Sequence, residues 1–131
     1  MIRRLASIVY LVTGVLIGLG AFGHGSHAPQ LGRVLAASPA IDASMAAVIV
    51  AVWYFVSGCM LAFGATVIWT WWRSRRGARD IFFPADAIAV FYIVAGVAIV
   101  IYTHIPFFWV FVVFGALLLI ASVPLRRDSR H

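Results

Sequence analysis

The side chains most able to do chemistry in this chain are three histidines near the ends of two apolar segments. His24 and His27 lie three residues apart in the stretch GHGSH, directly after the first apolar segment, and His104 directly follows the third. Imidazole binds zinc, copper and iron, including haem iron, and an i, i+3 pair can join a distant third ligand in one site. The sequence therefore offers His24, His27 and His104 as ligands of a transition metal or a haem. The alternative is that they are polar interfacial residues that hydrogen-bond within their own loops.

Few other groups suited to catalysis are present. All ten basic residues are arginine, all four acidic residues are aspartate, and the chain has no lysine, glutamate or asparagine. Asp86 lies at the start of the third apolar segment, where a carboxylate caps a helix and complements its dipole; a proton relay is the alternative. The single cysteine, Cys59, forms no disulfide within the chain. Without a recognisable nucleophile–base pair or phosphate loop, we expect no enzyme activity.

The composition predicts the class of protein that must position these residues. Hydrophobic residues make up 64% of the chain and charged residues 11%, with a mean hydropathy of +1.05, whereas soluble domains are about 45–50% apolar and about 25% charged. Four segments reach the ~20 apolar residues that span a bilayer as a helix: 5–23, 46–69, 85–103 and 107–125. Residues 1–131 are therefore predicted to form one all-α domain, an integral membrane four-helix up-and-down bundle. A short helix is also expected in the first loop, at 31–37.

The arginines predict the orientation of this bundle. Arg33 alone lies in a loop on one side, and the other side holds Arg3, Arg4, Arg73, Arg75, Arg76, Arg79, Arg126, Arg127 and Arg130. Because cytoplasmic flanks carry the positive excess, both termini are predicted to be cytoplasmic, in a bacterial inner membrane. The histidines would then lie at the periplasmic rim. The expected partners are the bilayer and anionic lipids at the cytoplasmic face, and not nucleic acid.

Helices in lipid approach one another through small residues. An aromatic residue stands one turn before a glycine in all four segments, in the pairs Tyr10/Gly14, Tyr54/Gly58, Tyr92/Gly96 and Phe111/Gly115. We therefore predict that the helices pack at Gly14, Gly18, Gly58, Gly96 and Gly115. The tyrosine hydroxyls are expected to meet backbone carbonyls. The likeness of YLVTGVLI from Tyr10 to YIVAGVAI from Tyr92 also favours a repeat of two related hairpins.

The stretches AFGHGSH and WYFVSGCMLAFG, with Met45 between them, resemble small uncharacterised four-span bacterial membrane proteins that have an HxxH after the first helix. This resemblance covers the first half of the chain and implies the four-span architecture without implying a reaction. AFGHG is also similar to an AFGAHG stretch of a second small four-span family, whose glycine pairs the last segment lacks. Small multidrug transporters and fluoride channels do not fit, because the first segment has no carboxylate and the pore asparagines are missing.

These observations favour a small non-enzymatic inner-membrane protein, an accessory or assembly subunit that packs against a larger membrane complex or against copies of itself. The alternative is a redox subunit that binds a metal or haem through its periplasmic histidines. That hypothesis requires the three histidines to lie close together. They would do so if the outer ends of the first and third segments, which are diagonal neighbours in the bundle, face each other. A further alternative is an oligomeric channel or a small transporter.

Overall fold

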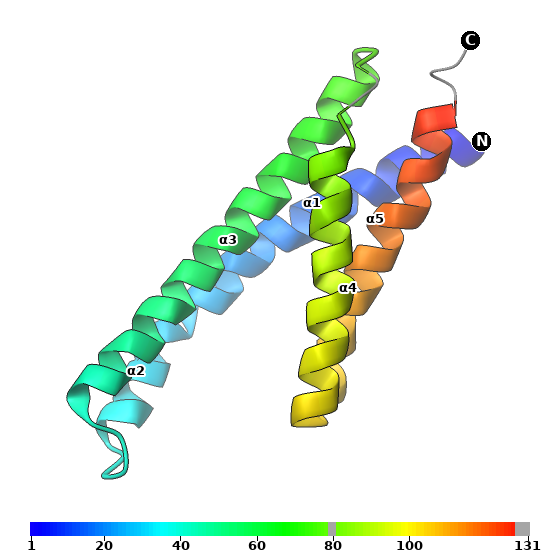
Figure 1. Ribbon diagram of the computed structural model, residues 1–131. Coiled ribbons are helices and arrows are strands. Elements are labelled where there is room, and N and C mark those ends of the chain that lie inside the picture. Colours follow the sequence, from blue (N-terminus) through cyan, green and yellow to red (C-terminus); the bar gives the residue numbers. More distant parts are fainter. Residues whose placement is uncertain (79–80, 128–131) are drawn as a thin grey trace.

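The computed structural model describes residues 1–78 and 81–127, and every regular element within these ranges is helical. In chain order these elements are α1 (Ile2–Ser26), α2 (Ala28–Ala36), α3 (Ala43–Arg75), α4 (Phe83–Thr103), the 3-10 turn η1 (Pro106–Phe108) and α5 (Trp109–Arg127), as drawn in Figure 1. Four stretches are long and apolar enough to cross a membrane: Ile2–Ala36, Ala43–Arg75, Phe83–Thr103 and Pro106–Arg126. The prediction of an all-α chain with four such helices is confirmed.

The elements begin and end where local chemistry directs them. Asp42 is the N-cap of α3, because its Oδ1 accepts hydrogen bonds from the Met45 N–H at 2.8 Å and from Ser44 Oγ at 2.6 Å. The bond from the Ser44 hydroxyl, and after it the bond from the Met45 N–H, favours the charged form and lowers the pKa of the exposed Asp42 carboxyl. α4 has a proline in its first turn and ends at His104, whose left-handed φ of 56° stops the helix. The short helix expected at 31–37 is α2, and it follows α1 almost directly at His27.

The helices form two hairpins. α1 packs along α3 and α4 along α5, while α1 also packs on α5, and α3 touches α4 over a shorter length. Figure 1 shows the hairpins in contact at one end and diverging toward the other. We call α1 with α3 the first hairpin and α4 with α5 the second hairpin. The end of the molecule at which the hairpins are in contact is the terminal end, where α1 begins, α3 ends, α4 begins and α5 ends. The opposite end, which carries α2 and η1, is the open end. The predicted up-and-down order is observed, but the bundle closes only at its terminal end.

Glycines set the closest helix contacts, and these contacts lie within each hairpin. A Cβ on Gly64 of α3 would lie 2.5 Å from Gly18 N and 2.8 Å from Gly14 O of α1. In the second hairpin, a Cβ on Gly96 would lie 2.9 Å from Val112 Cγ2. A Cβ on Gly14 would lie 2.7 Å from Val67 Cγ1, so added carbons at Gly14, Gly64 and Gly96 would push the helices apart. Gly18 also lies at the contact, where a Cβ would meet Gly64 Cα at an ordinary 3.8 Å. The predicted packing at Gly14, Gly18 and Gly96 is therefore observed.

The two remaining predicted packing positions, Gly58 and Gly115, have different outcomes. A Cβ on Gly115 would lie 2.7 Å from Ile93 Cγ1, so Gly115 lies at the contact of α5 with α4. A Cβ on Gly58 would meet nothing within 4 Å among the described residues. The prediction for Gly58 was therefore wrong, because the face of α3 that meets α1 carries Gly64 instead.

The buried apolar core occupies the terminal half of the molecule. It consists of buried residues from all four long helices and the start of α4, namely Ala6, Tyr10, Ile17, Val67, Phe82, Ala85, Ile88, Ala89, Tyr92, Leu118, Ala121 and Leu125. The hydroxyls of Tyr10 and Tyr92 are buried here with no hydrogen-bond partner among the described residues. The prediction that they meet backbone carbonyls was therefore wrong. The rings pack edge-on against aromatic neighbours, Tyr10 on Phe82 at 6.1 Å and Tyr92 on Phe111 at 5.7 Å.

An ion pair joins α4 to α5 at the terminal end. Arg126 donates from Nη2 to Asp86 Oδ2 and, at 3.2 Å, to Ser122 Oγ, while its guanidinium lies 4.9 Å from the centre of the Phe82 ring. Asp86 lies in the first turn of α4, where its charge complements the helix dipole. The N-cap position belongs to Phe82. The expectation that Asp86 caps the helix was therefore wrong, since its carboxylate binds the neighbouring helix.

Candidate functional site

His24 lies in the last turn of α1 and is held by two residues of α3. Its ring stacks on the Trp53 ring with the centres 4.0 Å apart and the planes at 13°. Its Nδ1 lies 3.0 Å from Ser57 Oγ, and the Trp53 indole N–H donates to the His24 carbonyl at 2.6 Å. Trp53 and Ser57 are four residues apart and share one face of α3. We refer to His24, Trp53 and Ser57 as the histidine cluster.

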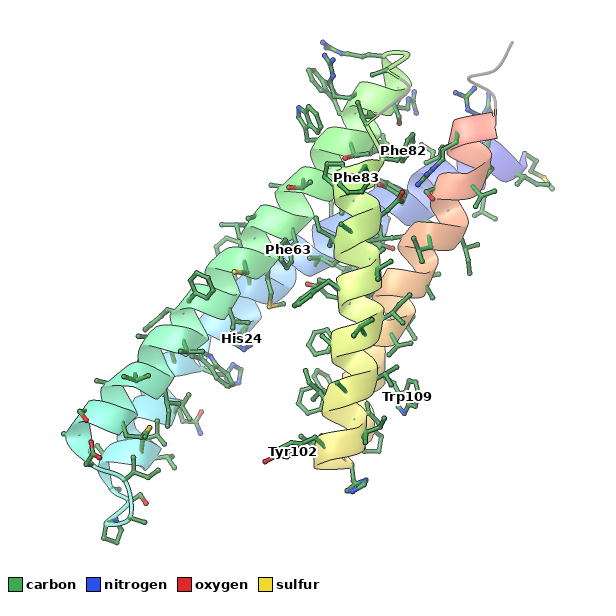
Figure 2. The ribbon with its side chains drawn as sticks, in the orientation of Figure 1. His24, Phe63, Phe82, Phe83, Tyr102 and Trp109 are labelled. Carbon is green, nitrogen blue, oxygen red and sulfur yellow. The ribbon has the colours of Figure 1, made fainter. Side chains whose placement is uncertain are left out.

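Gly25, next to His24, lies against the same serine. A Cβ on Gly25 would meet Ser57 Oγ at 3.4 Å and Ser57 Cβ at 3.7 Å, which are van der Waals contacts. Figure 2 shows His24 on the part of the first hairpin that faces α4. The cluster is therefore a fixed, half-buried polar group on a surface that the second hairpin leaves uncovered.

The hydrogen bonds of the cluster favour one tautomer of His24. Ser57 Oγ lies 3.0 Å from the Trp53 carbonyl, which can only accept, and 3.0 Å from His24 Nδ1. Because the hydroxyl has a single proton, both bonds form together when Nδ1 carries a proton, which in the neutral ring leaves a lone pair on Nε2. No hydrogen bond to Nε2 is found in the described part of the chain. A histidine that donates from one nitrogen and presents the other is the arrangement used by metal-bound imidazoles.

The other two predicted histidines do not join His24. His27 is exposed, and its Nδ1 lies 2.7 Å from the Gly23 carbonyl one turn back. His104 is exposed at the end of α4, on the second hairpin, where the molecule diverges. Within residues 1–78 and 81–127, no group of three or more His, Cys, Asp or Glu residues is placed to hold a metal ion. The structure thus does not bring together the histidines that the sequence proposed as one site.

The sequence analysis did not identify Trp53 and Ser57 as site residues. Their signal was the spacing W-x-x-x-S, which puts an indole and a hydroxyl on one helix face, beside a segment that ends in GHG. That spacing also occurs by chance in apolar helices, so only the contact of α1 with α3 identifies it.

The terminal end carries the arginines together with an aromatic belt. Three arginines near the end of α3 each stack on the tryptophan four residues earlier, with guanidinium-to-ring distances of 5.9 Å for Arg73 on Trp69, 5.6 Å for Arg75 on Trp71 and 3.9 Å for Arg76 on Trp72. Arg79 and Arg130 lie outside the described residues, as does the side chain of Arg127. Arginines paired with tryptophans are typical of a helix leaving the bilayer through its headgroup layer.

Comparison of the chain with protein-family models, with curated proteins and with solved structures finds no match. The candidate function therefore follows from the geometry of the two hairpins and the histidine cluster.

Proposed function

We propose that this protein is a non-enzymatic accessory or assembly subunit of a bacterial inner-membrane complex, and that it receives a transmembrane helix of a partner subunit between its diverging hairpins. One observation carries the proposal: the hairpins share a core only in their terminal half. In the other half, large apolar side chains of both hairpins are exposed, among them Phe22, Phe55, Val94, Ile101 and Tyr102.

The divergence has a cause in the sequence. The glycines that permit close approach lie at the α1–α3 and α4–α5 contacts. Between the hairpins, large rings meet instead, with Phe63 of α3 lying 5.8 Å from Phe91 and 6.3 Å from Tyr92 of α4. A contact through rings holds two helix axes farther apart than a contact through glycine, so α3 and α4 have less of the close van der Waals packing on which helix association in lipid depends. A partner helix would restore that contact.

The histidine cluster favours a helix over lipid alone as the occupant. Lipid tails offer no hydrogen-bond partner to an imidazole nitrogen, whereas a hydroxyl or amide on a partner helix does. The lone pair on His24 Nε2 would accept such a bond. Polar contacts between membrane helices contribute about 0.6 kcal/mol on average, enough to fix a register without fixing the partner permanently.

Site-directed photo-crosslinking tests this proposal with a matched pair of positions. Tyr102 and Trp109 are both exposed near the open end; in Figure 2, Tyr102 extends toward the first hairpin and Trp109 away from it. A benzophenone amino acid at position 102 should crosslink, in native membranes, to a transmembrane segment of one defined protein at fixed stoichiometry. The same group at position 109 should not. Equal capture at both positions, or capture only of a second copy of this chain, would overturn the proposal.

The tautomer of His24 supports a second candidate function, a metal- or haem-binding membrane subunit. His24 would be one ligand through Nε2, and the remaining ligands would come from a partner subunit or a second copy. Protein purified from its own membranes should then show a haem absorption band or stoichiometric bound metal. His24→Ala should abolish the signal, while His27→Ala, which alters an exposed histidine three residues away, should preserve it. A wild-type protein without either signal would exclude this candidate.

A further inference from the structure

A cavity of about 380 Å³ lies at the terminal end, between the first turns of α1, the last turns of α3 and the end of α5. Its lining residues are Arg3, Arg4, Ser7, Ser74, Arg75 and Leu125. The volume lies within the ~300–1,000 Å³ typical of small-molecule sites. Arg4 and Arg75 each bring a guanidinium group to this lining, so the cavity offers two positive charges to an anion. We propose that it binds the headgroup phosphates of an anionic phospholipid.

The walls of the cavity are fixed by contacts between α1 and α3. The Trp71 indole N–H donates to Ser7 Oγ at 2.8 Å, and Ser74 Oγ donates to the Trp71 carbonyl at 2.7 Å. The Arg75 guanidinium lies 5.6 Å from the centre of the Trp71 ring, which orients it. Ser7 is buried and uses its oxygen as the acceptor for Trp71, so its own proton is available to an acceptor inside the cavity.

The chemistry of these groups selects a phosphate. Guanidinium groups bind phosphate oxygens through paired hydrogen bonds, which a single ammonium group cannot reproduce. The site lies beside the tryptophan–arginine belt, at the level where a bilayer places its headgroups. Leu125 adds an apolar side that suits the glycerol and first acyl carbons. Basic pockets between transmembrane helices bind lipids of the cardiolipin type. A headgroup with two phosphates can pair one phosphate with Arg4 and the other with Arg75, which a headgroup with a single phosphodiester cannot do.

This site is independent of the partner-binding proposal, because the cavity is at the terminal end and the uncovered helix faces are at the open end. Native mass spectrometry of the full chain, released from micelles with added lipid, tests it directly. The protein should retain cardiolipin in preference to phosphatidylglycerol and should retain phosphatidylcholine least. Equal retention of cardiolipin and phosphatidylcholine would overturn the proposal. Displacement of bound cardiolipin by added inorganic phosphate would also overturn it, because the cavity would then be a site for free phosphate.

Two arginines of α3 provide a matched control. Arg75 lines the cavity, while Arg73, two residues earlier, stacks on Trp69 and is not among the lining residues. Arg75→Gln should weaken cardiolipin binding about fivefold, and Arg4→Gln with Arg75→Gln about 25-fold. Arg75→Lys should restore part of the affinity. If Arg73→Gln, which removes the same charge, weakens binding as much as Arg75→Gln, the arginines attract lipid only as a general positive surface and the site is disproved.

Discussion

Gly64 is the residue on which the contact between α1 and α3 most directly depends. A Cβ on Gly64 would lie 2.5 Å from the N and 2.6 Å from the Cα of Gly18. These are backbone atoms, which cannot rotate away as a side chain can. We expect Gly64→Ala to separate the helices and to lower the free energy of unfolding by about 1–3 kcal/mol. Unfolding in mixed micelles, followed by tryptophan fluorescence, measures the change.

Gly58→Ala is the control for this prediction, because it makes the same substitution in the same helix where nothing lies within 4 Å. Alanine favours helix more than glycine does, so this variant should be as stable as the wild type or slightly more stable. A larger loss at Gly58 than at Gly64 would show that α3 presents a different face to α1.

Between elements, the Asp86–Arg126 pair is the main polar link of α4 to α5. Both side chains are partly exposed, 25% for Asp86 and 43% for Arg126, so the interaction is weakened by solvent. We expect Asp86→Asn and Arg126→Gln each to destabilise the protein, and their double-mutant cycle to give a coupling of up to about 1 kcal/mol. High salt should shrink that coupling. Strictly additive effects, with no salt dependence, would contradict the direct pairing.

At the level of elements, the sequence predicted the positions of the helices, which depend on apolar runs. It did not predict which helix faces meet, because that depends on contacts between distant residues. The four spans follow from apolar length, so they were predictable within a few residues at most ends. α3 is the exception, since it extends over Ala43–Arg75 instead of the predicted 46–69. Asp42 caps its start, and its last turns, beyond the apolar run, hold the stacked tryptophan–arginine pairs. Gly64 and Gly58 differ only in the face they occupy, which the all-round apolar pattern of α3 does not reveal.

The separation of the histidines shows the same limit. An up-and-down bundle places the first and third spans diagonally, and parallel helices would have brought His24 toward His104. In the structure the hairpins diverge instead, and the contact between α3 and α4 is made by the rings of Phe63, Phe91 and Tyr92. Such a contact joins two helices distant in sequence, so it cannot be predicted from the residues of either helix alone.

For the whole molecule, the two hairpins are unequal in length. At 1.5 Å per residue, α3 with 33 residues is about 50 Å long and α4 with 21 residues about 31 Å long. A hydrocarbon core of ~30 Å matches α4, so α3 must tilt or extend beyond the bilayer. Its ends suit exposure to water, since one carries the Asp42–Ser44 cap and the other the stacked arginines. The tilt of the long hairpin against the short one thus agrees with the divergence in Figure 1.

The orientation of the protein in the membrane determines on which side the open end would meet a partner. The distribution of arginines predicts this orientation. In the described residues, Arg33 is the only arginine near the open end, and the others lie at the terminal end. Because arginines near helix ends resist translocation, the terminal end should be cytoplasmic and the open end periplasmic. Green fluorescent protein fused to the C-terminus should therefore fluoresce, and alkaline phosphatase inserted after Ser38 should be active. Replacing Arg3 and Arg4 with Gln while adding arginines beside Arg33 should shift the population toward the inverted orientation. Phosphatase activity at the C-terminus of the unaltered chain would instead place the open end, and the proposed partner contact, on the cytoplasmic side.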